Sequence, residues 1–156
     1  MNLSGAFTFA GPRATVWDLL QDPEVLARSL PGTERLTRVG EDRFEGAMTV
    51  SVGPVTAARF AVTVALGDKA PPERFTMQID GRGGVGFTRG TASIALTEPP
   101  EGGTLMDYTA DVQIGGRIAA VGQRLLESVA RAMMRQALDA LNRELQARLD
   151  AGAGPR

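Results

Sequence analysis

The sequence predicts an α+β fold in which a curved antiparallel sheet of about seven strands packs against one long C-terminal helix. Three observations support it. Apolar and polar residues alternate with a period of two through most of residues 33–114, in runs that turn signals separate. Two short helical patterns follow the first strand, and the end of the chain is rich in Ala, Leu, Arg, Glu and Gln. The 156 residues fit one domain, which we place at residues 1–150, before a disordered tail at 151–156.

The N-terminal part of the chain is expected to hold one strand and two short helices. The stretch "LSGAFTFA", residues 3–10, alternates as a strand does, and Gly11 with Pro12 ends it. The stretch "PRATVWDLLQ" is typical of a short helix with its proline in the first turn. In "DPEVLARSLPG", Asp22 is the expected N-cap and Pro23 the first helical residue, so a second short helix follows.

The middle of the chain is typical of a meander of about six strands. The alternating runs are "ERLTRV", "DRFEGAMTVSV", "VTAARFAVTVAL", "ERFTMQID", "FTRGTASIALT" and "TLMDYTADVQI". Glycine- or proline-containing turns separate them, so neighbouring strands are expected to be antiparallel. One face of the sheet should then be apolar and the other exposed to solvent. Only the long helix, which we expect from Arg117 to about Leu149, is large enough to cover the apolar face.

The composition argues against several classes of function. The formal net charge of −1 does not favour nucleic-acid binding. The chain contains no cysteine and no histidine, so it has no thiol nucleophile, no Ser-His-Asp triad and none of the commonest zinc ligands. We therefore expect no catalytic residues and no metal site. Because no apolar run approaches the ~20 residues of a membrane span and no signal peptide is evident, we expect a cytoplasmic protein.

A glycine-rich stretch at residues 80–90, "DGRGGVGFTRG", contains the pattern Gly81-x-Gly83-x-x-Gly86. This pattern binds dinucleotides only when a strand enters it and a helix leaves it. Here the run that leaves it alternates as a strand does. We therefore predict a hairpin turn at Gly83-Gly84 rather than a nucleotide site.

The long helix carries two apolar stripes with a basic sector between them. The first is expected to pack on the sheet and consists of Ile118, Val121, Leu125, Val129, Ala132 and Met133. The second begins later and roughly opposite, with Met134, Leu138, Leu141, Leu145 and Leu149. Because about 33 helical residues reach roughly 50 Å and a ten-residue strand about 33 Å, the last quarter of the helix should overhang the sheet. There it would contact a partner, a membrane or a second copy of the chain.

The basic sector consists of Arg117, Arg124, Arg131 and Arg135. One interpretation is a solvated face with local ion pairs, such as Glu127 with Arg131. The other is a surface that contacts anionic lipid headgroups or an acidic partner.

The apolar residues that should face the helix either fill a core or line a cavity. As candidate ligand-binding residues we select Leu26, Leu30, Phe60, Val62, Phe75, Met77, Ile94, Tyr108 and Val112, with Val121, Leu125, Val129 and Met133 from the helix. On the inward face, the hydroxyl of Tyr108 needs a partner, which could be a quinone carbonyl, a backbone group or water. Uptake of a lipid needs a movable lip, for which we select residues 26–32.

Four separate stretches carry a family resemblance: "DPEVLARSLPG", "VGPV", "GRGGVGFTRGTASIAL" and "YTADVQIGGRIAAVGQRLLESVAR". They resemble the family of the carbon monoxide dehydrogenase G subunit (CoxG), a branch of the START-like (SRPBCC) superfamily with the helix-grip fold, and the likeness covers residues 3 to about 145. The resemblance implies an apolar cavity between sheet and helix. It also implies work beside a molybdenum hydroxylase of the carbon monoxide dehydrogenase type, in attaching that enzyme to the membrane and in handling its quinone acceptor. Longer members carry an extension after the last helix, some with an apolar anchor, whereas this sequence stops at Arg156.

Together these features predict a non-enzymatic carrier. It would hold an isoprenoid quinone or a similar lipid and shuttle it between the inner face of the cell membrane, where it binds transiently, and the dehydrogenase. A second hypothesis is an adaptor without a ligand, which docks the dehydrogenase through the arginines and the second stripe. A third, less favoured for want of histidine, is a small cyclase or hydrolase. A homodimer through the C-terminal helix is compatible with each.

Overall fold

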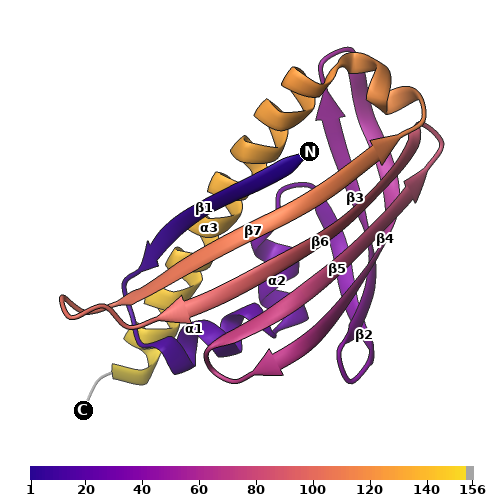
Figure 1. The fold of residues 1–156 in the computed structure, drawn as a ribbon. Coiled ribbons are helices and arrows are strands. Elements are labelled where there is room, and N and C mark those ends of the chain that lie inside the picture. The colour runs from indigo at the N-terminus through magenta and orange to yellow at the C-terminus, as the bar shows by residue number, and fades with distance from the viewer. Residues whose placement is uncertain (154–156) are drawn as a thin grey trace.

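The computed structural model describes residues 1–153 and has the architecture that the sequence predicts (Figure 1). In chain order the elements are β1 (Asn2–Phe9), α1 (Arg13–Leu20), α2 (Pro23–Ser29), β2 (Thr33–Gly40), β3 (Arg43–Val52), β4 (Val55–Ala70), β5 (Arg74–Gly83), β6 (Gly86–Thr97), β7 (Thr104–Gly115), the 3₁₀ helix η1 (Arg117–Val121) and α3 (Gln123–Ala153). The predicted fold class, a curved antiparallel sheet with two short helices and a long C-terminal helix, is confirmed.

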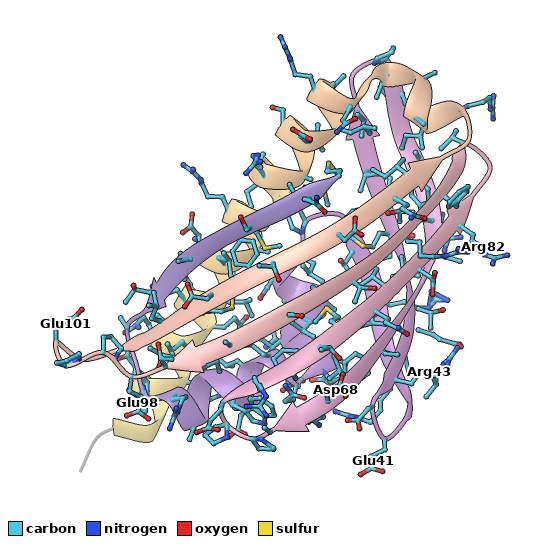
Figure 2. All side chains as sticks on the ribbon, viewed as in Figure 1. Glu41, Arg43, Asp68, Arg82, Glu98 and Glu101 are labelled. Atoms are coloured by element: carbon cyan, nitrogen blue, oxygen red, sulfur yellow. The ribbon has the colours of Figure 1, made fainter. Side chains whose placement is uncertain are left out.

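The sheet has seven strands in the order β1-β7-β6-β5-β4-β3-β2, and every neighbouring pair is antiparallel. Strands β2 to β7 form a meander, and β1 joins its far edge by pairing with β7. Charged side chains lie on the outer face: Arg43 and Arg82 point away from α3 (Figure 2). The inner face therefore carries the apolar half of each alternating strand.

The short helices α1 and α2 close one end of the grip. The Asp22 carboxylate caps α2 as expected, since its Oδ1 accepts hydrogen bonds from the backbone N–H groups of Glu24 and Val25 at 3.0 and 3.5 Å. Trp17 of α1 packs edge-on against Phe75 of β5, with ring centroids 5.3 Å apart. These buried rings make this end of the molecule a solid core.

The long helix begins and ends later than the sequence suggests. Gly116 and Gly122 adopt positive φ angles of 84° and 101°, so residues 117–121 form the separate helix η1 and α3 starts at Gln123. The prediction of an unbroken helix from Arg117 is wrong because glycine tolerates this left-handed geometry, which ends a regular helix. Residues 151–153 continue α3, so the predicted tail does not begin at 151; residues 154–156 lie outside the described part of the chain.

The glycine-rich stretch is a hairpin between β5 and β6, with the turn one residue later than predicted. Gly83 pairs with Gly86, which leaves Gly84 and Val85 in the turn. Of the three glycines at 83, 84 and 86, only Gly86 has a positive φ, at 144°. A strand leaves the turn, as expected, so the geometry of a dinucleotide site is absent from residues 80–97.

Candidate functional site

An apolar cavity of about 200 Å³ lies between the inner face of the sheet and the first half of α3. Strands β3 to β7 provide one wall, and η1 and α3 provide the other. The lining residues are Met1, Met48, Val50, Val52, Phe60, Val62, Ile79, Phe87, Thr88, Val112, Ile114, Ile118, Leu126, Val129, Ala130 and Met133. Thr88 is the single polar side chain among them, so the cavity suits a hydrophobic guest.

The hollow arises where inner-face positions lack bulky side chains. Along one row of the sheet, Val62 pairs with Gly81, Gly81 with Thr88, and Thr88 with Ile114. Gly90, at an inner-face position of the next row, also lacks a side chain. On the opposite wall, α3 presents the small side chain of Ala130. Local sequence thus leaves space at this end, whereas large aromatic rings fill the end closed by α1 and α2.

Three connecting segments surround this end of the cavity. The backbone N–H of Ile118 in η1 donates to the carbonyl oxygen of Val85 at 2.8 Å, and Nη2 of Arg117 donates to that of Gly84 at 2.9 Å. The β3–β4 turn approaches α3 closely: a Cβ atom at Gly53 would lie 2.7 Å from Leu125. Few polar contacts therefore hold η1 over this end of the sheet.

Five of the residues selected from the sequence line the cavity together: Phe60, Val62, Val112, Val129 and Met133. They come from two different strands and from α3, so the fold brings together segments far apart in the sequence. Whether they bind a ligand stays a prediction.

The other selected residues do not line this cavity. Leu26, Phe75 and Ile94 are buried in the solid core, and Leu30, Met77, Val121 and Leu125 are partly buried beside it. None of residues 26–32 lines the cavity, so the movable lip predicted there does not border it. Buried side chains of α1 and α2 pack into the core at that end, which the local pattern does not reveal.

Tyr108 also lies outside the lining. Its ring lies across Gly5 of the neighbouring strand β1, so close that a Cβ atom at Gly5 would meet the hydroxyl oxygen at 2.6 Å. The Tyr108 hydroxyl is therefore directed over the edge of the sheet rather than into the cavity.

Three of the lining residues that the sequence interpretation missed belong to β3. Met48, Val50 and Val52 alternate along that strand, and this period of two is a signal that could have identified them. Met1 was not identifiable in this way, because it reaches the cavity through its pairing with Val112 at the edge of the sheet.

The second apolar stripe of the long helix is buried in the core and does not extend past the sheet as an exposed surface. The side chains of Leu138, Leu141 and Leu145 are only 5%, 4% and 0% exposed, and Met134 is partly buried against the same core. The prediction that this part contacts a membrane, a partner or a second copy is wrong, because α1 and α2 cover it.

The first stripe is only partly confirmed: Leu125, Val129 and Met133 are partly buried on α3, whereas Ala132 is exposed, because it lies on the side of α3 that faces away from the sheet. Ile118 and Val121 belong to η1.

The basic sector remains at the surface. Arg124, Arg131 and Arg135 are exposed on α3, and Arg117 is exposed on η1. Within residues 1–153, none of these four arginines forms an ion pair with a carboxylate, and Glu127 instead accepts a hydrogen bond from Gln123 at 3.2 Å. Their positive charge is therefore available at the surface.

The described residues offer no metal site and no membrane span. In residues 1–153, no group of three or more His, Cys, Asp or Glu side chains is placed to hold a metal ion. None of the described helices is long and apolar enough to cross a membrane.

Comparison with known families decides the identity of the chain. The sequence profile of the family described as the G subunit of carbon monoxide dehydrogenase (CoxG) matches residues 5–146. The chain belongs to the CoxG family. The CoxG membership agrees with the resemblance found from the sequence. No curated protein sequence matches the chain.

Solved structures resemble this CoxG chain over nearly its whole length. A conserved protein from Geobacillus kaustophilus has 27% sequence identity and a TM-score of 0.89, with 94% of this chain and 96% of that chain covered. A START superfamily protein from Mycobacterium smegmatis has 12% identity and a TM-score of 0.70, covering 94% and 97%. The Zhui aromatase/cyclase from Streptomyces sp. R1128 has 17% identity and a TM-score of 0.73, covering 99% of both chains. These matches show the START-like fold, which together with the CoxG family suggests a ligand-binding protein.

Proposed function

We propose that this CoxG-family protein is a non-enzymatic carrier that binds an isoprenoid quinone or a similar lipid in its apolar cavity. It presents that ligand between the membrane and a molybdenum enzyme of the carbon monoxide dehydrogenase type. The observation that carries the proposal is the cavity itself: about 200 Å³ of space between sheet and helix, lined by apolar side chains with the exception of Thr88.

The size of the cavity determines how much of a ligand it can hold. Pockets for drug-sized molecules have volumes of roughly 300–1,000 Å³, so the cavity of about 200 Å³ takes one ring or a short prenyl segment. Each buried methylene contributes about 0.8 kcal/mol. The rest of a long chain would leave between η1 and the hairpins, where a membrane or partner can receive it.

Surface features near the cavity support a contact with anionic groups. Phe87, which lines the cavity, is 42% exposed, and the exposed Arg117 lies on η1 beside it. Arg124 follows at the start of α3. An apolar side chain beside arginines that form no ion pair with a carboxylate in the described residues suits the headgroup region of an anionic membrane or an acidic surface on the dehydrogenase. We place this contact at the inner face of the cell membrane.

The exposed arginines also favour a second candidate, an adaptor that docks the dehydrogenase without carrying a ligand. The two candidates differ in what the native protein contains. Organic extraction and mass spectrometry of the protein purified from its own cells should release a stoichiometric quinone or lipid if it is a carrier. Absence of any extracted lipid, with the dehydrogenase still bound, would favour the adaptor.

A pair of matched substitutions tests the cavity as the binding site. Ala130 lines the cavity, whereas Ala132 is exposed on the same helix. Ala130→Leu should fill the space and reduce the extracted ligand by about tenfold, because the buried methylenes of the ligand lose their site. Ala132→Leu should leave the yield unchanged. Equal yields from both variants would show that any co-purified lipid binds elsewhere.

The cyclase hypothesis has less support. The likeness to the aromatase/cyclase concerns the fold, and a cyclase needs polar groups that act on its substrate. Here the cavity lining offers one hydroxyl, that of Thr88. We therefore expect any extracted ligand to be returned chemically unchanged after incubation with the protein.

A further inference from the structure

We infer that the hydroxyl of Thr88 is the polar anchor of the cavity and selects compact apolar ligands that carry a carbonyl oxygen. The inference rests on the proposed function and makes it more specific, since it names the atom that recognises the ligand's oxygen. The geometry of the β5–β6–β7 part of the sheet supports it.

The side chain of Thr88 is oriented by the glycine beside it. Thr88 pairs with Gly81 across the β5–β6 ladder, and a Cβ atom at Gly81 would lie 2.8 Å from Cγ2 of Thr88. The threonine methyl therefore occupies the space that a side chain at position 81 would fill. Since Cγ2 and Oγ1 take different staggered positions on the same carbon, the hydroxyl is directed away from Gly81.

No polar group beside Thr88 satisfies that hydroxyl. On the other side Thr88 pairs with Ile114, which is apolar and also lines the cavity. The backbone groups of β6 are engaged in ladders with β5 and β7. Within the described residues, the Thr88 hydroxyl has no side-chain or backbone hydrogen-bond partner. The hydroxyl is therefore available to a guest.

This arrangement discriminates between guests by chemistry. A hydrocarbon that fills the cavity excludes water from the hydroxyl and leaves it unpaired, which opposes binding. A guest of the same shape with a carbonyl oxygen accepts a hydrogen bond from it. A ring quinone meets both requirements, because its ring matches the apolar lining and its carbonyl matches Thr88.

The test compares two small probes that differ only in this respect. Duroquinone (tetramethyl-1,4-benzoquinone) has two carbonyls where durene (1,2,4,5-tetramethylbenzene) has two C–H groups. Equilibrium dialysis measures the dissociation constants of both for the intact protein, Thr88→Val, Thr88→Ser and Thr91→Val. Thr88→Val replaces the hydroxyl by a methyl group, and Thr88→Ser keeps the hydroxyl. Thr91→Val is the control because Thr91 is exposed and belongs to the outer-facing set of β6.

We expect Thr88→Val to weaken duroquinone binding by about fivefold or more and to leave durene binding unchanged or tighter. Thr88→Ser and Thr91→Val should bind both probes as the unmodified protein does. The infrared carbonyl stretch of bound duroquinone should lie at lower frequency in the unmodified protein and in Thr88→Ser than in Thr88→Val. A merely structural role for Thr88 would not change that frequency.

The outcomes separate the inference from the proposed function. If duroquinone binds but Thr88→Val changes neither its affinity nor its carbonyl frequency, Thr88 is not the polar anchor. The proposal that the cavity binds the ligand is then unaffected. If Thr88→Val weakens both probes equally, Thr88 acts through packing and the anchor is again wrong. If the unmodified protein binds neither probe, the proposed function fails and the inference fails with it.

Discussion

At the scale of single residues, the glycines between positions 81 and 86 serve different physical needs. Gly81 leaves room for the methyl group of Thr88. A Cβ atom at Gly83 would meet the carbonyl oxygen of Arg59 at 2.2 Å, and one at Gly86 would meet that of Gly115 at 2.1 Å. Gly84, in contrast, faces open space. A pattern that resembles a nucleotide fingerprint is thus explained by close approaches between strands.

Gly86 and Gly84 therefore provide a matched pair of substitutions. Gly86→Ala should lower the free energy of unfolding by about 2 kcal/mol or more, because the new side chain meets a backbone oxygen and the φ of 144° disfavours it. Gly84→Ala should change it by less than about 0.5 kcal/mol. Urea denaturation followed by circular dichroism measures both. Equal losses would show that the hairpin is not positioned as described.

At the scale of elements, the two halves of α3 are held in different ways. The second half makes polar contacts with its neighbours: Asn142 and Gln146 bond the backbone of Ala10, and Glu144 accepts two hydrogen bonds from Arg28 of α2 at 2.9 and 3.1 Å. The first half instead borders the cavity. The end near α1 and α2 is therefore fixed, while the end at η1 has more freedom to admit a guest.

The contact between α2 and α3 gives the protein a specific pH dependence. The hydrogen bonds from Arg28 hold the pKa of the Glu144 carboxyl below its ordinary value, and the same contact raises the pKa of Arg28. Because the folded-state pKa of Glu144 is depressed, its stabilising contribution is present above the unfolded pKa, near 4.5, and is lost as the pH falls through the folded pKa.

Glu144→Gln should therefore be less stable than the unmodified protein at pH 7, and the difference should be smaller at about pH 2.5, below the unfolded pKa. Glu101→Gln is the control, since Glu101 is exposed in the β6–β7 loop (Figure 2). It should match the unmodified protein at both pH values. Urea midpoints measured at each pH check the prediction, which is contradicted if the effect of Glu144→Gln persists unchanged in acid.

At the scale of the whole molecule, a solid end and a hollow end divide the space between sheet and helix. Phe9, Trp17, Phe75 and Leu145 fill the solid end, each of them at least nine-tenths buried. Hydrophobic contacts between such side chains resist local opening, whereas an unfilled apolar space provides fewer of them. The fold therefore separates the region that provides stability from the region that can accept a ligand.

Hydrogen exchange should reveal this division. The backbone amides of residues 117–130 should exchange at least about tenfold faster than those of residues 137–146, because opening at the hollow end breaks fewer contacts. Added duroquinone should slow exchange at 117–130 and leave 137–146 unaffected. Mass spectrometry of peptides from the two segments measures both effects. Uniform exchange along the helix would contradict the division.

Much of the fold, but only part of the site, could be predicted from the sequence. Strand alternation and the cap at Asp22 are local signals, and they located the sheet and α2 correctly. Contacts with α1 and α2, which are distant in the sequence, decide which part of α3 is buried in the core and which part borders the cavity. Local patterns do not contain that information. For that reason Leu138 and Leu145 appeared free in the pattern, although they are core. Thr88 lies on the same face of β6 as Ile94, but a polar threonine and a small alanine such as Ala130 do not stand out in an apolar pattern.

The position of the single tryptophan has a practical consequence for spectroscopy. Trp17 stacks edge-on against Phe75 and is absent from the lining of the cavity. Its emission should therefore report whether helix α1 stays packed against the sheet. Binding of a colourless guest such as durene should not change that emission. The protein thus contains its own fluorescent indicator of integrity, placed outside the lining of the cavity.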